Sequence, residues 1–192
     1  VLDYIPNEDS SEQYKLVAQI PNTATATLRH VLCHQSGIPT WEFVDNWIRN
    51  GRGSSIMDPS KVWDKTETLH YLVQDRTPAT GAPGEHFSYS NTNYTLLGLV
   101  IGHCTQNSAA DEIRRRILEP LGLTSAYLES FETAPSAPST TKLTSHYHYV
   151  TRHFIETARI SRHFQPGWHP HIITTSACNL STEWTAGGMV MS

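Results

Sequence analysis

The residues whose types and spacing could most directly do chemistry are a tyrosine and an asparagine two positions apart, Tyr89 and Asn91. They follow a turn expected at Pro83-Gly84, because proline fixes φ and glycine tolerates a positive φ, and they precede an apolar helical pattern. A free phenol has a pKa of about 10, so Tyr89 would act as a base near neutral pH only beside an ammonium group that stabilises its phenolate. The Asn91 amide could donate a hydrogen bond to a substrate carbonyl. The pattern alone favours a structural interpretation, in which Tyr89 packs on the turn and Asn91 caps the helix.

Hydrophobic periodicity predicts a chain that is mainly helical to about residue 123 and irregular, with some strand, after it. Thr27 and Thr40 are suitable helix N-caps, and Asp64-x-x-Glu67 is similar to a capping box. Residues 143–175 are β-branched, aromatic and rich in histidine, which predicts short strands and loops. The predicted fold class is therefore mainly α with short β segments, and the predicted helices span residues 28–35, 41–50, 65–74, 92–104 and from 108 to Pro120.

These helices also predict which side chains face the interior. Gly98 and Gly102 lie four residues apart on the helix over 92–104, and they would let another element approach closely. Apolar side chains at helical spacing are expected to point inward: Leu28, Val31, Leu32, Trp41, Val44, Trp47, Ile48, Ile113, Ile117 and Leu118.

Composition narrows the class of protein and of partner. The chain has 192 residues, of which 38% are hydrophobic, so it can bury a sizeable core and wholesale disorder is not expected. A net charge of −4 argues against nucleic acid or an anionic membrane surface as a partner. No apolar run approaches the roughly 18 residues of a membrane span. The three cysteines, Cys33, Cys104 and Cys178, are too far apart for a disulfide framework and are expected to be buried thiols; the compartment stays open.

The eleven histidines raise the question of a metal site. His146 and His148 would share one face of a strand, and His169 and His171 flank a proline. Zinc requires three or four converging ligands, and no carboxylate or cysteine spacing accompanies these histidines. We therefore expect no metal and no other cofactor, and expect these side chains to line a substrate rim or to be exposed.

Four segments, in order along the chain, resemble one known family. Residues 27–39, TLRHVLCHQSGIP, are similar to a T-x-R-H-L-L-x-H-x-S-G-[LI]-P segment of the serine β-lactamase and penicillin-binding-protein superfamily. Residues 83–98 resemble the segment that carries the Tyr-x-Asn motif of that family, residues 117–123 resemble the helix exit that follows it, and residues 186–189 resemble a further segment. The likeness is to the branch that contains class C β-lactamases, D-alanyl-D-alanine carboxypeptidases, D-aminopeptidases and family VIII esterases.

The resemblance implies acyl transfer through a serine, on a substrate that carries an amide or ester carbonyl. In this family a Ser-x-x-Lys motif supplies the nucleophile and a lysine, and backbone N–H groups form the oxyanion hole. Carried over to this chain, Tyr89 would be the general acid/base that shares proton transfer with the lysine, and Asn91 would position the substrate. The family needs no metal.

Two parts of the family pattern are not found where they are expected. The nucleophile motif would lie before residue 1, and a Lys-Thr-Gly or His-x-Gly triplet would lie after residue 192. Ser139 and Lys142 match the Ser-x-x-Lys pattern, but they follow Tyr89 and lie in a proline-rich stretch. A chance match is the simpler explanation. His34 would cap helix carbonyls, and the resemblance makes it a fixed structural position near the site more than a proton carrier.

We therefore expect residues 1–192 to form one region, the central and mostly helical part of a β-lactamase/transpeptidase-like α/β domain whose two ends are absent. The parent would be a serine-dependent hydrolase of β-lactamase, D-peptidase, esterase or acyltransferase type acting on a small amide or ester. The alternative is a superfamily member that has lost catalysis and serves as a binding or scaffold protein. A Ser-x-x-Lys motif upstream of Val1 distinguishes the two.

Overall fold

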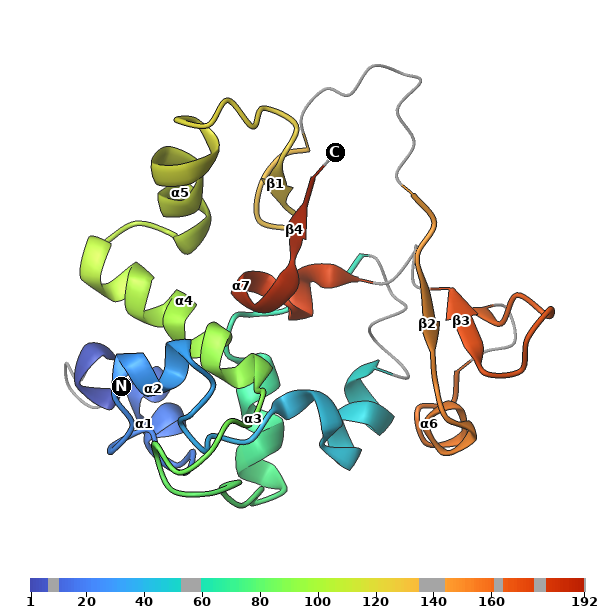
Figure 1. Cartoon of the computed structure of the whole chain (residues 1–192), viewed down its shortest axis with the longest axis horizontal. Coiled ribbons are helices and arrows are strands. Elements are labelled where there is room, and N and C mark those ends of the chain that lie inside the picture. The colour runs from blue at the N-terminus through green and yellow to red at the C-terminus, as the bar shows by residue number, and fades with distance from the viewer. Residues whose placement is uncertain (7–10, 53–59, 135–143, 161–163, 175–178, 192) are drawn as a thin grey trace.

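The computed structural model describes residues 1–6, 11–52, 60–134, 144–160, 164–174 and 179–191. This part of the chain is mainly helical, with two small antiparallel sheets of two strands each (Figure 1). The predicted class, mainly α with short β segments, is confirmed. None of the described helices combines the length and the apolar character that a bilayer span requires.

The described helices and strands are short, apart from one. The α-helices are α1 (Glu12–Ala18), α2 (Leu28–Leu32), α3 (Glu67–Gln74), α4 (Asn91–Thr105), α5 (Ala109–Ile113), α6 (Arg152–Thr157) and α7 (Trp184–Gly187). Single turns of 3-10 helix lie at η1 (Leu2–Tyr4), η3 (Trp41–Phe43) and η7 (Leu180–Thr182), and π-helical segments lie at η4 (Trp47–Arg52) and η5 (Arg114–Leu118). Strand β1 (Tyr127–Leu128) pairs with β4 (Met189–Val190), and β2 (Tyr147–Tyr149) pairs with β3 (Ile172–Thr174).

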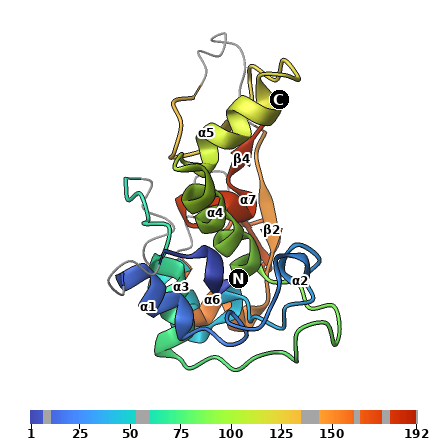
Figure 2. The same cartoon turned by 90° about the vertical axis from the view of Figure 1, so that its left-hand side faces the viewer.

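The long helix α4 crosses the molecule and contacts elements from both ends of the chain (Figures 1 and 2). Helices α2, α5 and α7 and the turns η1 and η3 all pack against it. Its buried face includes the polar residues Thr92 and Thr95. The Thr92 hydroxyl donates to the Pro39 carbonyl over 2.7 Å and accepts from the Trp41 N–H over 3.1 Å, so its burial leaves no unmade hydrogen bond.

Local capping signals explain where most helices begin. The Thr27 hydroxyl accepts the His30 N–H at the start of α2, and the Ser108 hydroxyl accepts the Asp111 N–H at the start of α5. The predicted capping box at Asp64 forms only in part: the Asp64 N–H donates to the Glu67 carboxylate over 2.7 Å, but the Asp64 side chain accepts the Thr66 N–H, and α3 begins at Glu67 rather than at residue 65.

The predicted continuous helix over residues 41–50 is wrong. This stretch forms the 3-10 turn η3 and then the π-helical segment η4. Thr40 makes no capping bond to η3, because its hydroxyl accepts the Asn91 N–H instead. Packing overrides helical propensity here: Trp41 and Trp47 are fully buried, and Trp47 meets the rings of Trp41, Trp63 and Tyr71 edge-on at 5.1 to 5.3 Å.

Several predicted burials are also wrong. Leu32 is 53% exposed, because α2 is barely more than one turn long and buries only Val31. Ile117 is 48% exposed, because the wider π-helical turn of η5 changes the angle between successive side chains and leaves Leu118 as the buried residue. Cys33 and Cys104 are exposed thiols, at the end of α2 and in the last turn of α4, and Cys178 lies outside the described residues.

Gly98 confirms the expected close approach, and Gly102 does not. A Cβ atom at Gly98 would lie 2.7 Å from the ring of Trp184 and would collide with the Thr185 hydroxyl. Trp184 is buried, and the Thr185 hydroxyl donates to the Tyr94 carbonyl over 2.8 Å, so neither can easily move. A Cβ atom at Gly102 would meet nothing closer than the Asn107 carbonyl at 3.6 Å. Helix α7 therefore packs directly on the backbone of α4 at Gly98.

We expect Gly98→Ala to lower the free energy of unfolding by about 1–3 kcal/mol, the usual cost of overpacking a well-filled contact. Gly102→Ala is the matched control on the same helix, and it should raise that free energy by up to about 1 kcal/mol, because alanine is the better helix former. Urea unfolding of both variants measures the difference. Equal effects of the two substitutions would contradict the close α4–α7 contact.

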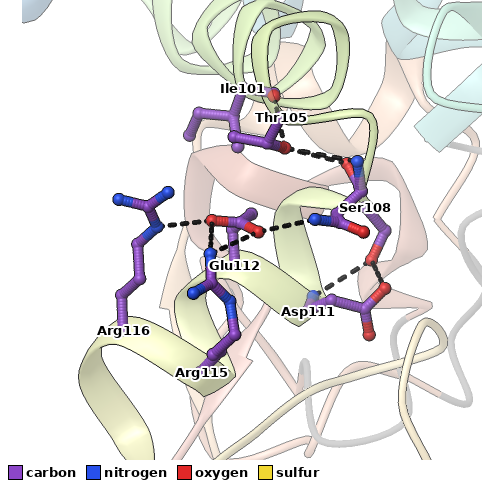
Figure 3. Close-up of polar contacts among 8 residues, drawn as sticks. Ile101, Thr105, Ser108, Asp111, Glu112, Arg115 and Arg116 are labelled. Atoms are coloured by element: carbon purple, nitrogen blue, oxygen red, sulfur yellow. Dashed lines mark hydrogen bonds and ion pairs between the residues drawn. The ribbon is translucent and has the colours of Figure 1, made fainter.

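A second anchor lies where α4 passes into α5 (Figure 3). The Glu112 carboxylate is buried and accepts hydrogen bonds from Arg115 at 2.8 Å, from Arg116, and from the Asn107 side-chain amide at 2.9 Å. Hydrogen bonds from Arg115, then from Arg116, lower the pKa of Glu112 from 4.5 to about 2. Because the folded pKa lies below the unfolded one, this stabilisation is complete above pH 4.5 and is lost as the pH falls toward 2.

We expect Glu112→Gln to lower the midpoint of thermal unfolding at pH 7, because glutamine fills the space but removes the charge that the two arginines bind. The gap between the wild-type chain and the variant should narrow as the pH falls from 4.5 toward 2. Glu119→Gln is the control, since Glu119 is exposed near the end of the same helical segment and its replacement should leave the midpoint almost unchanged. A gap that stays constant down to pH 2 would show that the charge of Glu112 does not stabilise the fold.

Candidate active site

The loop that carries Tyr89 lies against residues 34–37, more than 40 positions earlier in the sequence. Backbone hydrogen bonds join Ser88 N–H to the His34 carbonyl at 2.8 Å, Gly84 N–H to the Gln35 carbonyl at 2.7 Å, and Thr80 N–H to the Gly37 carbonyl at 2.9 Å. The bonds from Ser88 and Gly84 therefore join the two family-like segments recognised in the sequence, 27–39 and 83–98, and the bond from Thr80 extends the contact just before the second segment.

Asn22 and Gly37 hold this junction together. The Asn22 side-chain amide donates to the carbonyls of Ser36 and Gly81, at 2.9 and 2.8 Å. Gly37 has a φ of 66°, and a Cβ atom there would lie 2.6 Å from the Asn22 amide and would collide with the Gly81 carbonyl. Only glycine fits this position, for reasons of both backbone angle and space.

A buried network ties the same segment to the start of α4. The Ser36 hydroxyl donates to the Asn93 side-chain oxygen over 2.8 Å and also accepts the Ile38 N–H over 3.1 Å. The Asn93 side-chain nitrogen lies 3.3 Å from Nδ1 of His34. Ser36 and Asn93 are almost completely buried, so each of these hydrogen bonds replaces one that water would otherwise make.

His34 is the centre of an aromatic cluster beside this network. The centroid of its ring lies 4.5 Å from that of Tyr89 and 5.2 Å from that of Tyr94, with interplanar angles of 33° and 30°. The ring of Phe87 lies 5.8 Å away in an edge-on contact. The expectation that His34 caps helix carbonyls is wrong for its ring, because Nδ1 accepts the Ser90 N–H over 3.2 Å. Burial lowers the pKa of His34, which favours the neutral ring that this hydrogen bond requires.

The structure brings Tyr89 and Asn91 to one place but exposes them differently. Tyr89 is 55% exposed, while Asn91 is 6% exposed. The Asn91 side-chain amide donates to the Glu42 carboxylate over 3.0 Å, and its backbone N–H donates to the Thr40 hydroxyl. The suggestion that Asn91 caps the helix is wrong, because Ser90 occupies the N-cap position and Asn91 is the first residue of α4. The amide of Asn91 keeps an oxygen and a second N–H for other partners.

The electrostatic surroundings of Tyr89 keep its phenol protonated. Burial raises its pKa, and the nearby carboxylates of Glu42 and Glu183 and the neighbouring Tyr94 raise it further. Each of these influences raises the pKa of Tyr89, and among the described residues no cation is found to lower it. A proton-transfer role for Tyr89 therefore requires a cation beside the phenol. Ser139 and Lys142 lie outside the described residues.

The histidine-rich region forms a separate group around the β2–β3 sheet, which pairs His148 with Ile173. There the rings of Tyr149, His169 and His171 lie 5.6 to 5.8 Å from one another. Within the described residues no set of three or more histidine, cysteine, aspartate or glutamate side chains converges as a metal site would.

Three residues of the site were not predicted from the sequence: Glu42, Asn93 and Glu183. Asn93 carried one local signal, since an asparagine two positions after Asn91 would lie in the first turn of a buried helix. Glu42 and Glu183 carried none, because only the folded chain brings them near Tyr89.

Comparison with known proteins agrees with these motifs. The family model described as Beta-lactamase matches residues 1–191. Penicillin-binding protein 4* of Bacillus subtilis (strain 168) is 31% identical over 99 residues, which cover 50% of this chain and 20% of that protein. Protein flp of Staphylococcus aureus (strain NCTC 8325 / PS 47) is 34% identical over 104 residues, which cover 52% of this chain and 18% of that protein. The matched region is thus about a fifth of the length of these curated relatives.

Solved structures share the fold over most of the chain. D-amino acid amidase from Ochrobactrum anthropi SV3, in complex with L-phenylalanine amide, superposes with a TM-score of 0.63 at 24% identity, over 90% of this chain and 43% of that one. D-stereospecific amidohydrolase from Streptomyces sp. superposes with a TM-score of 0.64 at 21% identity, over 97% of this chain and 50% of that one. The described helices are those of the helical region of this fold. With the family model matched along almost its whole length, the chain belongs to the Beta-lactamase family.

Proposed function

We propose that this chain is the central, mostly helical part of a serine-dependent hydrolase that transfers the acyl group of an amide or ester. Tyr89 is the general acid/base, and Asn91 positions the substrate carbonyl. One observation carries the proposal: the Tyr89-Ser90-Asn91 segment lies at the start of helix α4, its Ser90 N–H donates to the His34 ring, and Tyr89 is still 55% exposed. A side chain held on a rigid support but open to solvent can meet a substrate.

In this proposal the nucleophilic serine and its lysine belong to a Ser-x-x-Lys motif of the complete protein upstream of Val1. A serine hydroxyl attacks the substrate carbonyl, the serine proton passes to the base, and the leaving amine or alcohol receives a proton as its bond to the carbonyl breaks. Water then hydrolyses the acyl-serine. Tyr89 can take part near neutral pH only if a lysine ammonium beside it offsets the carboxylates of Glu42 and Glu183, which raise its pKa. The proposal therefore places the lysine of the nucleophile motif next to the Tyr89 hydroxyl.

Amides are the first substrates to test. The solved structures that share the fold include a D-amino acid amidase in complex with L-phenylalanine amide and a D-stereospecific amidohydrolase. We therefore propose amino-acid amides of both configurations as the starting panel, with p-nitrophenyl esters and nitrocefin to test esterase and β-lactamase activity.

We expect Tyr89→Phe in the complete protein to lower kcat by about a hundredfold or more, because the ring stays in place but the proton-transferring hydroxyl is lost. Tyr94→Phe is the matched control: it removes a hydroxyl from the same aromatic cluster, and that hydroxyl donates a long, 3.4 Å hydrogen bond to the Leu32 carbonyl. Its kcat should stay within a few-fold of wild type. Steady-state kinetics on the amide panel measures both.

An unchanged kcat in Tyr89→Phe would remove Tyr89 from the mechanism. Absence of turnover on every substrate of the panel, in a correctly folded complete protein, would instead support a family member that binds without catalysis.

A further inference from the structure

His34 is built into the site by contacts that do not serve its own helix. Its Nδ1 accepts the Ser90 N–H at 3.2 Å and faces the Asn93 side-chain nitrogen at 3.3 Å. The face of its ring meets the ring of Tyr89 at 4.5 Å. Ser90 and Asn91 connect Tyr89 to α4, so these contacts fix both the backbone after Tyr89 and the plane of its ring.

The backbone of His34 shows that the position is adapted to this task. His34 has a φ of 54°, in the left-handed region that most side chains avoid. That conformation follows the last turn of α2 and lets the carbonyl of His34 accept the Ser88 N–H at 2.8 Å while its ring reaches Ser90. One residue thus holds the chain on both sides of Tyr89.

The partner atoms define which form of the ring fits. Asn93 has its side-chain oxygen committed to the Ser36 hydroxyl, so it presents its N–H₂ group to His34. The Ser90 N–H is also a donor. Two donors at Nδ1 require an unprotonated Nδ1, with the ring proton on Nε2.

We infer that His34 is a positioning residue for the proposed acid/base: its neutral ring, as acceptor at Nδ1 and as stacking partner, holds Tyr89 in the orientation that catalysis needs. This inference rests on the proposed function for its catalytic consequence, but not for the hydrogen bond itself. Protonation of His34 would place an N–H at Nδ1 against the two donors and break the support of the Tyr89 loop.

The pH dependence follows from the groups around the ring. The titratable side chains whose rings contact it are Tyr89 from the loop and Tyr94 from α4. Burial raises the pKa of the Tyr89 phenol. Burial lowers the pKa of His34 below 6.5. The folded state therefore favours the neutral ring, and the support is present at neutral pH and is lost as the pH falls below the usual range of histidine.

Two substitutions separate the acceptor from the ring. His34→Asn keeps an acceptor near the position of Nδ1 and tolerates a positive φ, but it cannot titrate. His34→Phe keeps an aromatic ring but has no acceptor. In the complete enzyme we expect His34→Phe to lower kcat tenfold or more with little change in KM. The kcat of His34→Asn should stay within about threefold of wild type at pH 7.5. As the pH is lowered, its kcat should fall less than that of the wild type, because asparagine cannot be protonated.

NMR of the wild-type protein tests the hydrogen bond directly, and it requires neither a folded variant nor catalytic turnover. In the complete protein with ¹⁵N-labelled histidine and serine, the NMR shifts of the His34 ring should identify Nδ1 as the unprotonated nitrogen at pH 7.5. The Ser90 amide should shift with the same midpoint as the His34 ring when the pH is lowered.

An Nδ1-protonated ring, or a Ser90 amide that does not follow the titration of His34, would overturn the inference. So would a His34→Asn variant that keeps the full acid limb or that loses as much kcat as His34→Phe. If Tyr89→Phe leaves kcat unchanged while the Ser90 amide does follow His34, the proposed role of Tyr89 fails and the structural support by His34 stands.

Discussion

The candidate site depends on one buried contact, the pairing of the Ser36–His34 segment with the first turn of α4 through Asn93. Ser36 and Asn93 are almost free of solvent contact, and the Ser36 hydroxyl donates to the Asn93 oxygen while the Asn93 nitrogen faces His34. Such a network is costly if one member is removed, because the remaining polar atoms stay buried without partners. It therefore sets the position of the loop that leads into Tyr89.

Helix α4 carries this arrangement into the rest of the fold. Its first turn holds Asn91 and Asn93, its middle accepts α7 at Gly98, and its C-terminal end connects to the α5 segment that Glu112 anchors. Elements from both ends of the described chain therefore meet on one helix (Figure 2). A site at the N-terminal end of such a helix is supported on rigid backbone, which is what precise placement of a reacting group requires.

The features that the sequence predicted correctly are those with local causes. The hydroxyls of Thr27 and Ser108 each accept the N–H three residues later, so the starts of α2 and α5 could be placed from spacing alone. The Tyr-x-Asn pattern marked Tyr89 and Asn91 as a pair. The failures have long-range causes. The helix expected over 41–50 yields to the burial of two tryptophans, and the Thr40 hydroxyl is taken by an N–H from α4. The ring of His34 likewise finds its partner 56 positions away rather than on its own helix. The catalytic roles of Tyr89 and Asn91 stay predictions.

If Tyr89 belongs to the site of an acyl-transferring serine, covalent labelling of that serine should depend on Tyr89. The complete protein is treated with a fluorophosphonate or penicillin probe. Intact-protein mass spectrometry then detects the covalent adduct, and peptide mapping identifies the modified residue. We predict one adduct, on a serine of a Ser-x-x-Lys motif upstream of Val1, which forms much more slowly in Tyr89→Phe. No adduct, or an adduct on Ser139, would show that Tyr89 does not act with an upstream serine.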